Sequence, residues 1–210
     1  MAAAWEGKPL NYARMSRQLR VSGKAARAQV QQLADSGMIW LLHPLDVSTL
    51  PAPCAGAKVR KTPKLYLREA QPGRENPFRS RMVRTVCRLE IERRRSSTFW
   101  YYGGYGRTHV ELIIQTARKR IGFVFLEENR FNRWSWSYCR RTLRQGIMQG
   151  AFVLYPGRRI FFVADRMVAL PGDEFFRFYG RWMNACLGSS RKLLSRLVRS
   201  YNTSHAEDLS

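Results

Sequence analysis

The sequence predicts a protein of the α+β or α/β class, in which a helical N-terminal part precedes a mixed β-sheet flanked by helices. Two β-rich apolar runs, Thr108–Ile114 and Ile121–Leu126, are separated by a short basic turn. This is the pattern of a β-hairpin, and nearly continuous apolar strands are expected to be covered on both faces. After Leu126, strand-like and helical segments alternate, which favours a mixed sheet with helices on both faces.

The chain is strongly basic, with 37 Lys and Arg against 15 Asp and Glu and a formal net charge of +22 over 210 residues. A positive charge of this size attracts polyanions. Arginine greatly outnumbers lysine, which favours bidentate contacts to phosphate. Nucleic acid is therefore the expected partner, DNA before RNA, and an anionic membrane surface is the less favoured one. The alternative is a chain that is basic without any such ligand.

The four cysteines, Cys54, Cys87, Cys139 and Cys186, are far apart and include no CxxC pair. Neither a zinc site nor a disulfide framework is expected from this spacing. No apolar run approaches the roughly 18 residues of a membrane span, so none is expected. The first residues, Met1–Trp5, lead directly into patterned sequence and are not expected to be a targeting peptide. A reduced, cytoplasmic setting is the expectation.

Residues 1–70 are predicted to form a winged helix-turn-helix domain. A first helix should begin after Asn11 as N-cap, and a second after Ser22. The apolar positions of the second helix, at i, i+4 and i+7, are Ala26, Val30 and Leu33. Gly37 is suited to end this helix in the left-handed conformation. Two strands, Met38–Leu42 and Lys64–Arg68, should follow on either side of a long Pro-rich loop.

The order helix, turn, helix, strand, loop, strand suggests which residues contact nucleic acid. The second helix would enter a major groove and the basic loop would contact phosphates. The candidate residues are Lys24, Arg27 and Gln31 on the helix and Lys58, Arg60 and Lys61 on the loop. The alternative is a solvated helix face in a domain that only packs on its neighbour.

Residues 70–79 are rich in turn-forming residues and mark a predicted domain boundary. A helix over Met82–Arg94 follows and is heavily loaded with arginine; Arg84 and Arg88 are its candidate phosphate contacts. A strand is expected at Phe99–Tyr102. The glycine cluster Gly103–Gly106 lacks the GK[ST] ending of a P-loop and is expected to be a turn.

The second half should begin with a helix in which aromatic and serine residues alternate, starting near Trp134 and running to Gln149, with Gly150 at its end. The expected elements that follow are strands Ala151–Tyr155, Ile160–Val163 and Met167–Leu170, a helix over 171–178, and a basic amphipathic helix over 189–201. Residues from Asn202 are expected to be disordered. The predicted domains are thus 1–70, 78–180 and 188–210.

The span from Ala4 to Phe176 resembles the C-terminal half of a prokaryotic ATPase family. The segments that carry it are Leu10–Tyr12, Leu19–Ser22, Thr62–Arg68, Lys119–Phe123 and Val153–Gly157, which leads to Ala164-Asp165. The Lys-x-Tyr-Leu-Arg and Tyr-Pro-Gly pieces are the specific ones. In that family an AAA-type P-loop domain is followed by a winged helix and a PD-(D/E)XK restriction-endonuclease-like domain. The resemblance implies this endonuclease-like fold for residues 78–180. No GxxxxGK[ST] motif is present, so ATP hydrolysis is not implied.

The resemblance also allows the family's nuclease site to be placed residue by residue. Arg84 matches the acid of the first helix, Glu111 matches the acid of the hairpin strand, and Val124 and Leu126 match the E-x-K pair. Metal-dependent cleavage needs at least two carboxylates to hold Mg²⁺, and a lysine beside them. The expectation is therefore a non-catalytic nucleic-acid-binding protein with a degenerate nuclease-like domain, no catalytic residues and no cofactor.

Two alternatives stay open. In the first, Glu111 acts with Glu127 or Glu128 to hold Mg²⁺ in a surviving nuclease. In the second, the chain is a detached C-terminal module that docks on a P-loop ATPase partner chain. Under the first alternative Glu111 is the candidate metal ligand.

Overall fold

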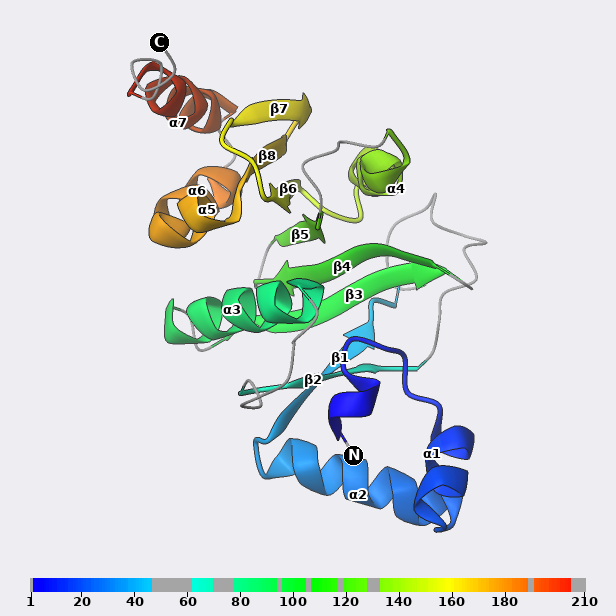
Figure 1. Cartoon of the computed structure of the whole chain (residues 1–210). Coiled ribbons are helices and arrows are strands. Elements are labelled where there is room, and N and C mark those ends of the chain that lie inside the picture. The colour runs from blue at the N-terminus through cyan, green and yellow to red at the C-terminus, as the bar shows by residue number, and fades with distance from the viewer. Residues whose placement is uncertain are drawn as a thin grey trace.

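The computed structural model of this chain describes residues 2–46, 62–69, 78–93, 96–104, 107–116, 119–127, 133–188 and 191–204 (Figure 1). An eight-stranded mixed sheet, in the order β2-β1-β3-β4-β5-β6-β8-β7, runs through the molecule. Helices flank both faces of the sheet, as the sequence predicted (Figure 1). No helix in these ranges is both long enough and apolar enough to span a membrane.

The N-terminal segment contains η1 (Ala2–Trp5), α1 (Tyr12–Leu19) and α2 (Gly23–Asp35). Both predicted caps are confirmed, because Asn11 accepts a hydrogen bond from the Arg14 N–H and Ser22 accepts one from the Ala25 N–H. Such caps satisfy amide groups that have no partner inside the helix. Gly37 follows α2 with φ of +73°, the left-handed conformation predicted for it.

Strands β1 (Ile39–Pro44) and β2 (Lys64–Leu67) form an antiparallel pair that separates two cores. Ile39, Leu65 and Leu67 pack with residues of η1, α1 and α2. Leu42 and Tyr66 face the other way, into the core beneath α3. The four residues of β2 are all buried because both of its faces are covered. The loop that would form the wing lies outside the described residues, so the winged helix stays a prediction.

The sheet continues across the predicted domain boundary, because β1 pairs in parallel with β3 (Thr98–Gly104) through His43 and Pro44. Strand β3 pairs with β4 (Arg107–Gln115), and β4 pairs antiparallel with β5 (Arg120–Phe125). The predicted central hairpin is therefore confirmed. Residues 70–77, where the boundary was expected, lie outside the described ranges.

Beyond the hairpin, α4 (Arg133–Arg144) connects β5 to β6 (Gly150–Tyr155), and these two strands are parallel. Strand β8 (Met167–Pro171) lies parallel to β6, and the edge strand β7 (Phe161–Ala164) is antiparallel to β8. The prediction that α4 runs to Gln149 was wrong. The chain leaves the helix after Arg144 and turns at Gly146, whose φ is +69°, before Gly150 starts β6.

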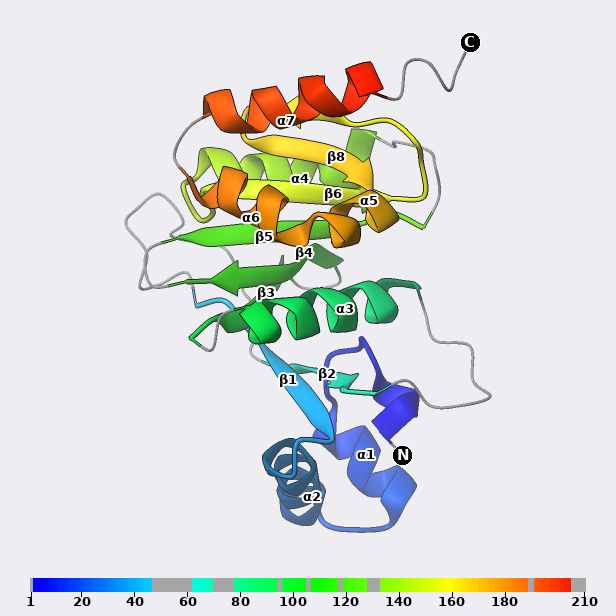
Figure 2. The same ribbon diagram turned by 90° about the vertical axis from the view of Figure 1, so that its left-hand side faces the viewer.

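The remaining helices are α3 (Phe78–Arg93), α5 (Gly172–Arg177), α6 (Tyr179–Leu187) and α7 (Arg191–Ser204). They cover one face of the sheet, and α4 covers the other (Figure 2). The core on the α3 side contains Phe123, Phe152 and Phe175, and the core on the α4 side contains Val124, Val153 and Met148. The sequence did not predict α6, and α7 extends three residues past the predicted end at Tyr201.

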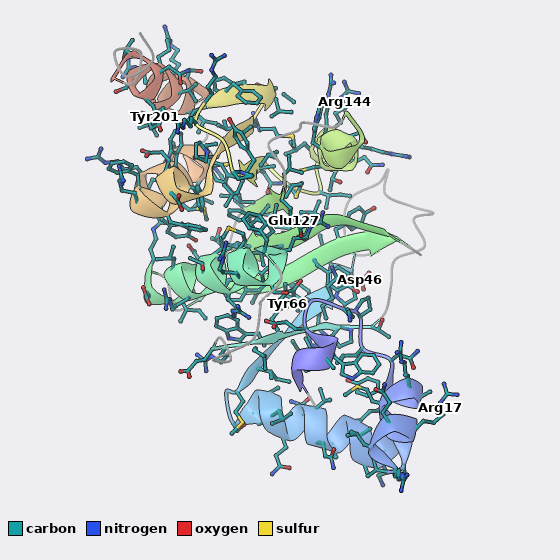
Figure 3. All side chains as sticks on the ribbon, in the orientation of Figure 1. Arg17, Asp46, Tyr66, Glu127, Arg144 and Tyr201 are labelled. Carbon is teal, nitrogen blue, oxygen red and sulfur yellow. The ribbon has the colours of Figure 1, made fainter. Side chains whose placement is uncertain are left out.

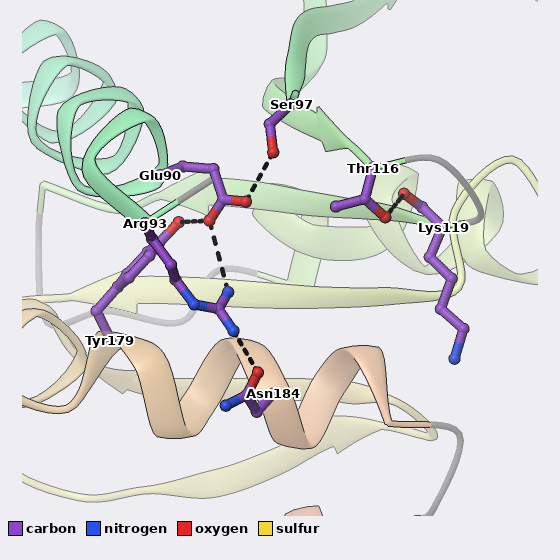
Figure 4. Close-up of polar contacts among 7 residues, drawn as sticks. All are labelled: Glu90, Arg93, Ser97, Thr116, Lys119, Tyr179 and Asn184. Carbon is purple, nitrogen blue, oxygen red and sulfur yellow. Dashed lines mark hydrogen bonds and ion pairs between the residues drawn. The ribbon is translucent and has the colours of Figure 1, made fainter. Parts of the chain in front are cut away.

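A buried polar network joins α3 to α6 (Figure 4). The fully buried Glu90 carboxylate accepts hydrogen bonds from Ser97 Oγ at 2.8 Å and from the Tyr179 hydroxyl at 2.7 Å. Arg93 forms an ion pair with this carboxylate at 3.6 Å and donates a hydrogen bond to Asn184 Oδ1. Because a buried carboxylate is stable only when it is paired and hydrogen-bonded, the network fixes how α6 packs on α3.

Candidate functional site

Glu111 is turned toward α3 by an irregularity in the strand pairing. Trp100 pairs with Ile113 and Tyr102 pairs with Val110, so Tyr101 lies opposite two residues, Glu111 and Leu112. One extra residue on one strand is a β-bulge, which re-aims a side chain and is common beside functional sites. The bulge allows the carboxylate of Glu111 to reach the first turn of α3 from within an apolar strand.

The Arg79 guanidinium lies between two carboxylates. Its NH1 atom is 3.5 Å from Glu111 Oε1, and its Nε atom is 3.4 Å from Glu127 Oε1. The side chains of Arg79 and Glu127 are half exposed, whereas only 10% of the Glu111 side chain is exposed. Glu111 and Glu127 therefore converge, as the nuclease alternative requires, but the cation between them is supplied by the chain itself.

The electrostatics of Glu111 are dominated by its burial. Burial raises the pKa of this carboxyl, against the opposing charges of Arg79 and Lys64 and the N–H groups of Glu111 and Phe125. Its Oε2 atom has no hydrogen-bond partner in the described part of the chain. The ionised form is thus incompletely stabilised, and a divalent cation using both carboxylates would have to displace Arg79.

Arg84, predicted to contact phosphates, is instead an interior residue. It is 7% exposed and donates from NH1 to Glu6 Oε1, and Glu6 is equally buried. Removing a charge from water is costly unless a partner compensates, and Glu6 is that partner. Arg84 is therefore excluded from the predicted nucleic-acid contacts. Its pairing with Glu6 attaches the N-terminal segment to α3.

The two residues matched to the E-x-K pair, Val124 and Leu126, lie away from Glu111. Val124 and Leu126 are buried in the core under α4, on the opposite face of the sheet from Arg79 and Glu111. The residues of β5 that share the α3 face are Phe123 and Phe125. A shift of one residue moves every side chain of a strand to the other face, so positions 124 and 126 cannot complete a site with Glu111. Neither alternative register provides an acid or a lysine inside β5.

The predicted residues of the second helix lie together on the exposed side of α2. Lys24, Arg27 and Gln31 are all exposed, at i, i+3 and i+7. The Arg27 guanidinium lies 5.0 Å from the centre of the Tyr12 ring, and Gln31 donates to Asp35 at 2.8 Å. This face is therefore basic and accessible.

Of the other predicted contacts, Arg88 is exposed on α3 and lies 3.8 Å from Glu92 in a surface ion pair. Lys58, Arg60 and Lys61, and also Glu128, lie outside the described residues. Sequence reasoning did not single out Arg79 or Lys64 as site residues. Their positions depend on the bulge and on the packing of β2 against α3, and neither has a local sequence signal.

The cysteines of the described ranges are buried or partly buried. Cys87, Cys139 and Cys186 are free thiols. Burial raises the pKa of Cys87 and Cys139 well above the ordinary value, and raises that of Cys186 to about 12. Thiolates would therefore be scarce at neutral pH. Within the same ranges, no three His, Cys, Asp or Glu side chains gather as a metal-binding group.

Comparison of the chain with protein-family models, with curated proteins and with solved structures gives no match.

Proposed function

We propose that this protein is a non-catalytic nucleic-acid-binding protein, more suited to DNA than to RNA, in which a nuclease-like domain has lost its metal site. The proposal rests above all on Arg79, whose guanidinium neutralises both Glu111 and Glu127 where a metal ion would have to sit. Cleavage by a nuclease of this kind needs a divalent ion to activate water. An arginine cannot replace the metal ion in this role, because its guanidinium group does not coordinate a water molecule and lower its pKa as a divalent ion does.

The chain topology supports the nuclease-like assignment. Helix α3 is followed by the β3-β4-β5 meander, by α4 and by β6 parallel to β5. This α-β-β-β-α-β order is compatible with the endonuclease-like fold that the resemblance implied. A shared fold does not transfer an activity, so the fold alone indicates neither cleavage nor binding.

The exposed charges favour a polyanion as the partner. The net charge is +22, and Lys24, Arg27 and Gln31 form an accessible face on α2. Each phosphate that is neutralised releases condensed counterions, so the affinity should fall linearly with salt on logarithmic axes. The residues that read a groove would lie on α2, and the bulk charge would supply non-specific affinity.

The test is a salt titration of binding to duplex DNA and to RNA of equal length. The Lys24→Gln/Arg27→Gln variant should weaken binding and reduce the salt slope by about two, since roughly one unit is lost per phosphate contact. The matched control is Arg181→Gln/Arg196→Gln, which removes the same charge from exposed positions on α6 and α7. Absence of binding at low salt contradicts the proposal, and an equal loss in the control contradicts the assignment to α2.

A metal-dependent nuclease is the second candidate, because Glu111 and Glu127 converge and Glu111 Oε2 has no hydrogen-bond partner among the described residues. Under this reading these two carboxylates would hold Mg²⁺ once Arg79 withdrew, and the ion would activate water. Incubation with supercoiled plasmid and Mg²⁺ or Mn²⁺ distinguishes the candidates. We expect no nicking. Nicking that Glu111→Gln abolishes, while Glu92→Gln leaves it intact, would establish the nuclease instead.

A further inference from the structure

A second charged region lies on the other face of the sheet, where the C-terminal end of α4 meets the turn between β7 and β8. A cavity of about 320 Å³ opens there, and its polar lining comes from Arg140, Arg144, Gln149, Asp165 and Arg166. The apolar part of the lining is formed by Leu143, Met148 and Ala164. Figure 3 shows Arg144 on α4, at the opposite end of the molecule from Arg17 on α1.

The lining has a clear excess of positive charge, with three guanidinium groups, those of Arg140, Arg144 and Arg166, and one carboxylate, that of Asp165. All three arginines are exposed, so solvent screens their mutual repulsion when no anion is bound. They come from two separate elements, α4 and the β7–β8 turn. Only the fold brings them to the same cavity.

Two of the three arginines are constrained by their surroundings. The guanidinium of Arg140 lies 6.0 Å from the centre of the Trp136 ring, at the limit of a cation–π contact. Arg166 has φ of +57°, a left-handed conformation that is unfavourable for a residue with a β-carbon. This conformation belongs to the two-residue turn, Asp165-Arg166, that joins β7 to β8. The Arg166 carbonyl accepts a hydrogen bond from the Ala151 N–H at 2.9 Å, which attaches the turn to β6.

We propose that this cavity binds a phosphate monoester. Three guanidinium groups opposed by one carboxylate leave an excess of two positive charges, which suits a phosphate dianion. Arginine is the residue best matched to phosphate because its planar donors make paired hydrogen bonds. The ligand can be a free nucleotide or the terminal phosphate of a nucleic acid, since both present the same group. The site is separate from the α2 face and does not depend on it.

The test is calorimetric titration of the full chain with AMP, with adenosine and with inorganic phosphate. AMP should bind saturably, and adenosine should bind at least about tenfold more weakly, because charge-assisted hydrogen bonds are lost. Arg144→Gln and Arg166→Asn should each weaken AMP binding by about tenfold or more. Asparagine is chosen at position 166 because it tolerates the left-handed conformation. The control, Arg181→Gln, removes one charge from α6 on the opposite face and should leave the affinity unchanged.

The source of the phosphate is decided with a short DNA strand that carries either a 5′-phosphate or a 5′-hydroxyl. Tighter binding of the phosphorylated strand than of AMP, lost in Arg144→Gln, identifies a nucleic-acid end as the ligand. Saturable binding of AMP, with no difference between the 5′-phosphate and 5′-hydroxyl strands, identifies a free nucleotide.

Three results overturn the proposal: equal binding of AMP and adenosine, unchanged affinity in both cavity variants, or an equal loss in Arg181→Gln. Binding of the 5′-hydroxyl strand, which lacks the terminal phosphate, measures the affinity of the α2 face and not that of the cavity. The two proposals can therefore fail independently.

Discussion

The two faces of the sheet use the same residue type in opposite ways. On the α3 face, arginines contact carboxylates of the same chain: Arg79 contacts Glu111 and Glu127, Arg84 contacts Glu6, and Arg93 contacts Glu90. On the α4 face, Arg140, Arg144 and Arg166 surround an open cavity whose lining includes a single carboxylate. These two sets of arginines therefore differ: the first is neutralised by carboxylates of the fold, and the second lines a cavity with an excess of positive charge.

This difference limits what a count of charges can predict. A net charge of +22 indicates a polyanionic partner, but it does not say which arginines are available. Arg84 and Arg88 lie four residues apart on α3, yet one is buried in an ion pair and the other is exposed. Ion pairs of the two kinds have very different energies, because a buried charge loses its water while an exposed one keeps it. Breaking pairs on the α3 face should therefore lower stability, and changes on the α4 face should not.

The largest effect is expected at the buried pair of Arg84 and Glu6. Arg84→Met leaves the Glu6 carboxylate buried without its partner and should lower the free energy of unfolding by about 3–5 kcal/mol. Urea denaturation measures this change. The double variant Glu6→Leu/Arg84→Met should recover most of the loss, because it leaves no unpaired charge.

The surface variant Arg88→Gln is the control for that experiment, and it should change the stability by less than about 0.5 kcal/mol. If Arg84→Met is no more destabilising than Arg88→Gln, the contrast between buried and exposed arginines on α3 is wrong.

The next largest effect concerns the network between α3 and α6. Tyr179→Phe removes a hydroxyl that donates to the buried Glu90 carboxylate at 2.7 Å, and it should cost about 1–3 kcal/mol. Burial and the neighbouring Glu90 carboxylate also raise the pKa of Tyr179 above its ordinary value. The hydroxyl therefore stays a donor throughout the neutral range. Phe178→Leu, at an exposed neighbouring residue, is the control, and equal losses in the two variants would show that the hydrogen bond contributes nothing.

A smaller and pH-dependent effect is expected at Glu111. Burial raises the pKa of this carboxyl in the folded chain above its ordinary value of 4.5. Folding therefore favours the protonated form, and the associated stability is complete below 4.5 and is lost as pH rises through the folded-state pKa. Glu111→Gln should remove this pH-dependent loss. The stability of the variant relative to that of the native chain should therefore increase as pH rises.

Arg79→Gln should act in the opposite sense, because it removes a cation that lowers the pKa of Glu111. The loss of stability should then extend to higher pH. Its size should stay within about 1 kcal/mol at neutral pH, because Arg79 is half exposed. Urea denaturation from pH 4 to pH 8, with Glu92→Gln as a control, measures both effects. Parallel pH profiles for all the variants would mean that Arg79 does not act on Glu111.

Much of the fold is local and could be predicted from the sequence. The hairpin of β4 and β5, the caps at Asn11 and Ser22, and the left-handed Gly37 each follow from patterns within a few residues. The site could not be predicted in the same way. One extra residue in β4 turns Glu111 toward α3, and one residue of register in β5 places Val124 on the opposite face. The nucleic-acid and ATPase partners and the cytoplasmic setting stay predictions.

The smallest change in stability is expected on the α4 face, at Arg144→Gln. Its guanidinium is exposed beside two others, so its removal should change the free energy of unfolding by less than about 0.5 kcal/mol, with a slight gain from reduced repulsion. The two faces should then respond oppositely to a ligand. A ligand that binds only the folded chain stabilises it by RT ln(1 + [L]/Kd), about 2.7 kcal/mol at a hundred times Kd. AMP at that concentration should therefore raise the Tm of the native chain and of Arg79→Gln by the same amount. In Arg144→Gln, whose affinity is about tenfold lower, the stabilisation should fall to about half. A rise in Arg144→Gln as large as that of the native chain would place the bound anion elsewhere on this basic surface, and the distinction between the two groups of arginines would fail.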